Sequence, residues 1–534
     1  MSNQDKKLID TCTSKEVEAL FQEERTPDGK PVKIAPAYPL DGVVITELKK
    51  LSERMQNEND EYEIFRHRDR VDELWGLLLE KAIICLRFYD TREPFGESNG
   101  AKKPKAYGIE DLTAYYEKYT KFERVLYGSG RYYRDHVIHV FRTWLLGVEQ
   151  LVKNSADYLD NLAIREKKIG LALNRKEKLS MWTIIALTHD LGYPLEKAKS
   201  IIDVTQDMLT NFIADPNISV DFSFHGVQNY MNDFVLRLMS SKMEQRQAYQ
   251  PKKDGEETQP CYVARLQSKY YFKFQKSLER NKHGILSSLI IYKMLTYFLE
   301  SDYSLNEDYK FDKEECRQFY IRREILRAIA SHTCDDIYQM YMGSFSFLLR
   351  ICDDTQEWGR KNISELYVKS AQTYALEDIA LNFGEGTANN TCTIRETMTL
   401  PDQESVKTIF YRFHKQALTY VMIFRDGQDT SLRDFAFERK LTIKCENIKM
   451  EIDLIINNDE ASKLTGVITY VSDRAINQRY GSGFFKEMLG KMCKGNPGNL
   501  PEECFTIADA SGKKIADEVA GKWDKGQFTL PLSV

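Results

Sequence analysis

The stretch ALTHDLGYP, residues 186–194, is the starting point for interpreting this chain. His189 and Asp190 are adjacent at the end of an apolar run, and Gly192 and Pro194 then supply a break and the start of another helix. A histidine beside a carboxylate at a buried helix end is costly unless the two are paired or bound to a cation. Because neutral imidazole and ionised carboxylate are both metal ligands, the stretch predicts a metal site on a helical scaffold.

The sequence on both sides of this stretch is predominantly helical in pattern. Apolar residues recur at helical spacing in HVIHVFRTWLLGVEQLV, GILSSLIIYKMLTYFL and REILRAIASH. We therefore predict a mainly α protein, with an N-terminal helical region at 1–125 and a metal-binding helical domain at 126–368. The segment 240–261 is polar and aperiodic, and we expect it to be a surface loop within an insertion at about 215–275.

The pattern changes after about residue 370. RKLTIKCE, KMEIDLIIN and LTGVITYVS alternate apolar and polar residues, which is typical of half-buried strands, and the tail GKWDKGQFTLPLSV supplies a candidate closing strand. We predict a separate C-terminal α+β domain at 369–534 with antiparallel strands. No motif in this region indicates its role.

Four more candidate ligands lie in contexts like that of the doublet. His139 begins HVFRTWLLG, where a basic residue and an apolar run follow it, and His283 precedes a small residue and a helix in KHGILSSLIIYKML. His332 ends the apolar helix of EILRAIASHTCDD, and Asp353 follows the apolar helix of FLLRICDDTQEWGR. The order is His, His-Asp, His, His, Asp.

This ordered set resembles the two-metal branch of the HD superfamily, which is named for its His-Asp doublet. The resemblance implies that Asp190 bridges two divalent transition metals (Mn, Fe, Co or Ni), with His139, His189 and Asp353 on one ion and His283 and His332 on the other. It further implies that a metal-activated hydroxide attacks phosphorus. Single-metal members need only the first histidine, the doublet and the final aspartate, so the number of ions stays open here.

Several neighbouring residues are alternatives or additions to this set. His136 lies one helical turn before His139, His225 is an alternative to His283, and Asp354 competes with Asp353. A phosphohydrolase also needs cations to bind phosphate, and we prefer Arg134 and Lys282 for this role. The other basic residues beside the motifs are Arg131, Arg142, Lys197 and Arg360.

Composition limits the class of protein. The chain has 534 residues, 75 Lys plus Arg against 80 Asp plus Glu, and a formal net charge of −5, so no overall basic excess indicates nucleic-acid binding. We find no apolar signal segment and no apolar stretch of membrane-spanning length, and the ten cysteines form no CxxC pair. We expect a cytoplasmic protein with reduced thiols and no membrane association, in which homo-oligomers are possible.

Three functions are compatible with these residues. The resemblance favours a metal-dependent phosphohydrolase acting on a nucleotide or a related small phosphorylated substrate. A di-iron oxygenase on an HD-type site is the first alternative, because its ligands occur in the same order. A non-catalytic protein that senses nucleotides or binds a partner is the second.

Overall fold

A computed structural model describes most of the chain and divides it into two compact units. The helical unit comprises residues 1–335, 343–356 and 360–364, and the C-terminal unit comprises 336–342, 357–359 and 365–534. The residues that the structure describes are 4–22, 37–56, 60, 62–90, 106–129, 134–163, 173–213, 227–246, 261–306, 308–335, 337, 340–360, 372–384, 390–424, 435–445, 448–457, 463–470, 506–509 and 525–531.

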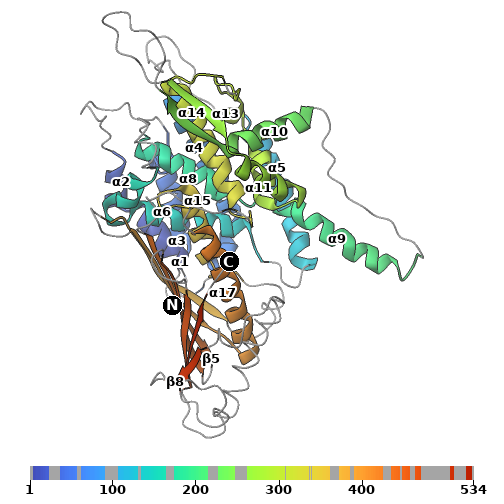
Figure 1. The fold of residues 1–534 in the computed structure, drawn as a ribbon, viewed down its shortest axis with the longest axis vertical. Helices are drawn as coiled ribbons and strands as arrows, with labels where there is room; N and C mark the ends of the chain where they lie inside the picture. The colour runs from blue at the N-terminus through green and yellow to red at the C-terminus, as the bar shows by residue number, and fades with distance from the viewer. Residues whose placement is uncertain are drawn as a thin grey trace, which may run out of the picture. The chain divides into compact units, whose positions relative to one another are not determined.

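Helices make up nearly all of the regular structure in the first unit (Figure 1). They are α1 (Gln4–Cys12), α2 (Lys15–Leu20), α3 (Gly42–Arg54), the short 3₁₀ helix η1 (Glu63–His67), α4 (Arg68–Asp90), α5 (Ile109–Ser129), α6 (Val137–Asn161), α8 (Arg175–Thr188), α9 (Tyr193–Leu209), α10 (Val227–Ser240), α11 (Ser268–Glu279), α12 (His283–Met294), α13 (Thr296–Leu299), α14 (Lys313–Ser331) and α15 (Phe345–Thr355).

The two helices that end at a candidate histidine begin with the same capping arrangement. In α8, the Asn174 side chain accepts from the backbone N–H of Glu177, whose side chain accepts from the N–H of Asn174. In α14, Asp312 and Glu315 make the same reciprocal pair. Each capping box satisfies amide groups that the first helical turn leaves without partners, so both helices start at defined residues.

The N-terminal helices pack against the helices of the predicted metal-binding region. The Arg142 guanidinium of α6 donates to both carboxylate oxygens of Asp5 in α1, at 2.8 and 2.7 Å, and both side chains are buried. In α4, Trp75 Nε1 donates to the carbonyl oxygen of Leu187 in α8, two residues before His189. The N-terminal region therefore supports the helices that carry the candidate ligands.

The polar segment predicted as a loop is partly strand. Ser241–Arg246 forms β1, which pairs antiparallel with β2 (Cys261–Leu266), while residues 247–260 lie outside the described part. The expectation of a loop throughout 240–261 was wrong, because pairing with β2 organises a strand that has no apolar alternation of its own. α10 and α11 flank this hairpin in the chain.

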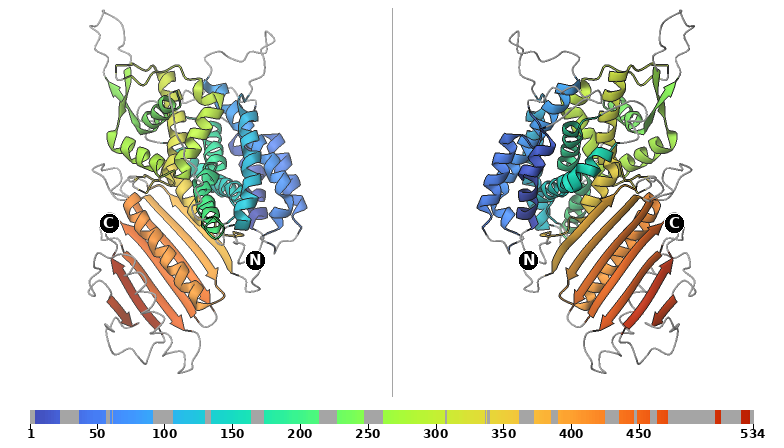
Figure 2. Two further views of the ribbon diagram at one scale, coloured as in Figure 1. Left: turned by 90° about the vertical axis from the view of Figure 1, so that its right-hand side faces the viewer. Right: turned by 90° about the vertical axis from the view of Figure 1, so that its left-hand side faces the viewer.

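The C-terminal unit contains a seven-stranded sheet and the helix α17 (Gln403–Ile423), which covers one face of the sheet (Figure 2). The strand order is β3-β4-β5-β6-β7-β9-β8. The strands are β3 (Thr373–Asn382), β4 (Asn390–Thr399), β5 (Phe435–Cys445), β6 (Ile448–Asn457), β7 (Lys463–Tyr470), β8 (Thr506–Asp509) and β9 (Lys525–Pro531).

The expected alternating strands are present, and the tail supplies β9 beside β7. One detail of the predicted sheet was wrong: β4 and β5 are parallel, whereas all the other pairs in the sheet are antiparallel. α17 lies between β4 and β5 in the chain, and a crossover through a helix is what allows two consecutive strands to run in the same direction.

The structure confirms a mainly α protein with strands concentrated in its C-terminal part. Among the described helices, none combines the length and the hydropathy that crossing a bilayer requires.

Candidate metal centre

The six predicted ligands converge on one point in the helical unit, although they come from five parts of the chain. They are His139 within α6, His189 at the end of α8 and Asp190 immediately after it, His283 at the start of α12, His332 at the end of α14 and Asp353 within α15. Three overlapping groups of these residues each have their ligand atoms within 4.8 Å of one another.

His189 and His332 occupy equivalent positions on two helices. Each is the C-cap residue of its helix, and its Nδ1 contacts the carbonyl oxygen three residues earlier, that of Ala186 at 2.8 Å and that of Ile329. Since a carbonyl only accepts, each Nδ1 carries the proton and each Nε2 presents a lone pair when the ring is neutral. Both Nε2 atoms are buried and have no hydrogen-bond partner among the described residues.

The other two histidines also have their Nδ1 atoms held by an acceptor. His139 Nδ1 contacts the side-chain oxygen of Gln356, and His283 Nδ1 lies 2.6 Å from Glu196 Oε2. In all four histidines, the nitrogen that faces the aspartates is therefore Nε2. A hydrogen bond at the opposite ring nitrogen is the usual way in which proteins orient metal-binding histidines.

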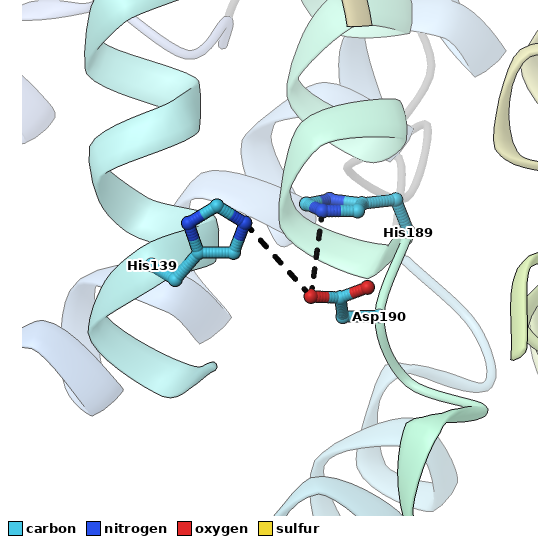
Figure 3. Close-up of side chains that lie close together, drawn as sticks. All are labelled: His139, His189 and Asp190. Atoms are coloured by element: carbon cyan, nitrogen blue, oxygen red, sulfur yellow. Dashed lines mark ion pairs between the residues drawn. The ribbon is translucent and has the colours of Figure 1, made fainter. Parts of the chain in front are cut away.

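Asp190 directs its two carboxylate oxygens at different pairs of histidines. Oδ2 lies 3.5 Å from His189 Nε2 and 4.0 Å from His139 Nε2. Figure 3 marks both ion pairs with dashed lines. Oδ1 lies 3.3 Å from His283 Nε2 and 3.6 Å from His332 Nε2. Each oxygen of Asp190 thus faces its own pair of histidines, and a further group, His189, His332 and Asp353, joins the two pairs.

Asp353, rather than Asp354, belongs to this cluster. Its Oδ1 lies 2.8 Å from His139 Nε2 and 3.8 Å from His189 Nε2, so it joins the pair that faces Asp190 Oδ2. Asp354 instead forms an ion pair with Arg350, at 2.8 Å, one turn earlier on α15.

Two glycines allow the helices to meet closely at the centre. A Cβ atom on Gly192 would lie 2.4 Å from the carbonyl oxygen of His283, and one on Gly284 would lie 2.6 Å from the carbonyl oxygen of Ile329. The Cβ of Gly284 would also come within 3.0 Å of the His332 ring. The absence of these side chains lets α12 approach both α14 and the turn after His189, which brings His283 and His332 to a ring separation of 5.0 Å.

The electrostatics of the cluster are those of buried carboxylates held ionised by imidazoles. Burial alone raises the pKa of Asp190, but the charge of His189 and the contacts of Asp190 with His283 and His332 bring that pKa well below its usual value. Burial lowers the pKa of His332. Burial is also the largest influence on the pKa of His139, which is lowered in spite of its hydrogen bond to Asp353. The pKa of His189 is raised instead, because Asp190 and Asp353 outweigh its burial, and that of His283 is raised to about 9 by Asp190 and Glu196. A metal ion that binds here would therefore replace protons on these two rings.

A divalent cation fits these donors. The two buried Nε2 atoms of His189 and His332 have no hydrogen-bond partner in the described structure, and burying such an atom unpaired costs free energy. Imidazole and carboxylate are both common ligands of divalent transition metals. Each of the three groups formed by these six residues could hold a metal ion.

His136, considered as an addition to the ligands, lies beside this cluster. Its ring stacks on that of Tyr193 with centroids 3.9 Å apart, and Tyr193 in turn meets the His283 ring edge-on at 5.1 Å. His136 is not part of any of the three ligand groups. His225, the alternative to His283, lies outside the described residues.

The basic side chains considered for phosphate binding lie in different surroundings. Lys282 Nζ forms an ion pair with Asp335 at 3.2 Å, and Arg142 is buried against Asp5. Lys197 Nζ lies 5.0 Å from the centre of the Tyr193 ring. Arg131 lies outside the described residues.

Arg134 and Arg360 act electrostatically on groups of the centre. Burial, together with the charges of Asp190 and Glu196, raises the pKa of Tyr193 to about 12, and Arg360 and Arg134 oppose that increase. Arg360 also lowers the pKa of His139, after the larger effect of burial. Arg360 was one of the less favoured basic residues in the sequence, and its charge acts on Tyr193, His136 and His139.

Sequence reasoning missed the two side chains that contact histidine Nδ1 atoms, Glu196 at His283 and Gln356 at His139. Glu196 comes six residues after Asp190, in the first turn of α9, where an acidic residue is already explained by the helix dipole. Gln356 comes three residues after Asp353, as the C-cap residue of α15. Their closeness to the ligands in sequence was the only signal available.

Comparison with protein-family models, with curated proteins and with solved structures finds no match to this chain.

Proposed function

We propose that this protein is a metal-dependent phosphohydrolase of the HD type, which hydrolyses a phosphoester bond of a nucleotide or a related small phosphorylated substrate. The observation that carries the proposal is the position of Asp190. One of its oxygens faces His139 and His189 and the other faces His283 and His332, at 3.3–4.0 Å. A carboxylate whose two oxygens face different imidazoles could bridge two cations, and a pair of cations stabilises both the attacking and the leaving oxygen in phosphoester hydrolysis.

The protein contributes a preorganised set of ligands. All four imidazoles have Nδ1 at an acceptor, which leaves each Nε2 directed at the aspartates before any ion binds. Bound divalent cations would supply an activated water and neutralise negative charge on the phosphoryl oxygens. Preorganised ligands need no rearrangement during the reaction, which is the main advantage of a fixed electrostatic site.

The charge around the centre supports an anionic substrate. Arg134 and Arg360 both act on the Tyr193 hydroxyl, and Arg360 acts also on His136 and His139. Positive side chains beside a metal centre attract anions and compensate the charge of a phosphate group. The two arginines therefore support a negatively charged substrate, and the oxygen measurement described below separates hydrolysis from the di-iron alternative.

The test is a substrate screen with the full chain. The protein is stripped with EDTA, reloaded separately with Mn²⁺, Fe²⁺, Co²⁺ or Ni²⁺, and assayed for phosphate and pyrophosphate release from nucleoside mono-, di- and triphosphates and cyclic nucleotides. Oxygen consumption is recorded in parallel. We expect hydrolysis by at least one metal form and a loss of more than about 10³-fold in Asp190→Ala, because both ions lose a ligand; one missing oxyanion donor alone costs about 10²–10³.

The control variant is His67→Ala, which removes a histidine of η1 outside the cluster and should keep the parent's activity. Oxygen consumption by the iron form without phosphate release would establish the oxygenase alternative instead. A metal-loaded protein that shows neither reaction on any substrate class would contradict the proposal.

A further inference from the structure

The four imidazoles of the centre differ in what holds their Nδ1 atoms. For His189 and His332 the acceptor is a backbone carbonyl, and for His139 it is the uncharged amide of Gln356. His283 alone has a carboxylate there, that of Glu196. One position of the centre is thus backed by a carboxylate, whose other oxygen, Oε1, lies 3.6 Å from Lys197 Nζ.

Glu196 contacts His283 twice through a single oxygen. Its Oε2 accepts from the backbone N–H of His283 at 2.7 Å and lies 2.6 Å from Nδ1 of the same residue. The first contact satisfies an amide at the start of α12, and the second fixes the rotation of the ring. With Nδ1 held in this way, His283 Nε2 lies 3.3 Å from Asp190 Oδ1.

We propose that Glu196 is a positioning residue that determines whether the second metal position, formed by Asp190, His283 and His332, is occupied. The proposal rests on the two-ion centre described above. The second position has two neutral imidazoles and one oxygen of a shared aspartate, while the first has Asp353 in addition. The second position shares its only carboxylate ligand, Asp190, with the first, and Glu196 adds a further negative charge through its contact with His283 Nδ1.

The Glu196 carboxylate acts on a bound ion through the His283 imidazole ring. A carboxylate at Nδ1 makes Nε2 a stronger electron-pair donor and compensates part of the cation's charge. Loss of such a partner typically lowers metal affinity by about 10–100-fold. In the absence of an ion the same coupling raises the pKa of His283 to about 9 and lowers that of Glu196 to about 2, against the effect of burial on each.

Other contacts hold α9 and α12 together, so the role of Glu196 is separable from folding. The N–H of Gly192 donates to Ser287 Oγ at 2.8 Å, and Ser287 Oγ donates to the carbonyl oxygen of His189 at 2.7 Å. Both bonds are buried and involve no atom of Glu196. We therefore expect variants at Glu196 to fold.

The experiment is a Mn²⁺ titration of the EDTA-stripped full chain, followed by electron paramagnetic resonance, which detects the coupling of two neighbouring ions. The parent should bind two Mn²⁺ in two steps and give a coupled signal. Glu196→Ala should weaken the weaker step by about 10–100-fold and abolish the coupled signal, with the tighter step unchanged. Glu196→Gln keeps a hydrogen-bond acceptor but no charge, so the affinity of its weaker Mn²⁺ step should lie between those of the parent and Glu196→Ala.

Gln356→Ala is the matched control, because it removes the group behind His139 and should weaken the tighter step instead. Equal weakening of both steps in Glu196→Ala and Glu196→Gln would assign Glu196 to helix packing and overturn the proposal. Two unchanged steps in both variants would also overturn it, with the two-ion centre intact. A parent that binds a single Mn²⁺ would refute the two-ion centre itself, and the role of Glu196 with it.

Discussion

Two buried clusters of charged side chains, one in each unit, show how a structural cluster differs from a candidate site. In the C-terminal unit, Arg439 of β5 donates from Nε and Nη2 to Glu396 of β4 at 2.6 and 2.9 Å, and from Nη1 to Gln416 of α17 at 3.2 Å. Tyr374 donates to the same glutamate. Donors meet acceptors throughout, so the cluster is complete as it stands.

The metal centre lacks this balance. Carboxylate oxygens face imidazole nitrogens, and the Nε2 atoms of His189 and His332 have no hydrogen-bond partner in the described structure. Neutral imidazoles and carboxylates are both electron-pair donors, so these contacts need positive charge, either from a bound metal ion or from ring protons such as that of His283, whose pKa is raised to about 9. Both clusters are buried, but only in the C-terminal cluster does each charged side chain meet a partner of opposite charge.

The largest effect should come from emptying half of the metal centre. His283→Ala or His332→Ala should lower the Mn²⁺ content from two ions per chain towards one, while His139, His189, Asp190 and Asp353 retain the first ion. Hydrolysis should fall by at least about 10²–10³-fold, since the second ion no longer neutralises phosphoryl charge.

Metal analysis of the dialysed variants and their turnover rates check this expectation. A parent with one ion per chain that neither variant removes would contradict the division of ligands that the Asp190 oxygens suggest.

The second prediction concerns the Arg439–Glu396 cluster of the C-terminal unit, from which one charged partner is removed. Arg439→Met leaves Glu396 buried without its cation and should lower the free energy of unfolding by about 3–5 kcal/mol. The double variant Glu396→Leu with Arg439→Met should recover most of that loss, because it removes the uncompensated charge. Urea denaturation in EDTA, followed by circular dichroism, measures both.

In both C-terminal variants the Mn²⁺ content should equal that of the parent, since every proposed ligand lies in the helical unit. If the single and the double variant were equally destabilised, the loss would be due to packing rather than to charge.

The smallest effect concerns pH in the ion-free protein. The pKa of Glu196 falls from 4.5 to about 2, so its contribution to stability is complete above pH 4.5 and is lost as the pH falls through 2. The pKa of His283 rises from 6.5 to about 9, so its contribution is complete below pH 6.5 and is lost as the pH rises through 9. Both contributions are therefore present between pH 4.5 and 6.5.

In EDTA, the difference in thermal stability between the parent and Glu196→Gln should be greatest in that range and shrink towards pH 10. A difference that stays constant from pH 6 to 10 would mean that the charges of Glu196 and His283 do not stabilise each other.

The sequence by itself determined the types of the candidate ligands and the helices that carry them. His189 and His332 each end an apolar run, and a helix end is a local property of the chain, so both were found as C-cap residues. The alternating strands of the C-terminal unit were likewise readable, because the period of two reflects which face of the sheet each side chain occupies. Local periodicity carries this information without any knowledge of the neighbours.

Only the tertiary structure decided which atoms meet. Glu196 and His283 are 87 residues apart, and Gln356 and His139 are 217 apart, so no local pattern relates them. The same holds for the parallel pairing of β4 with β5, which no strand pattern specifies. The two oxygens of Asp190 face different histidines because α12 and α14 pack closely at Gly284. Such distances depend on how helices pack, and packing is a property of the whole core rather than of any one segment.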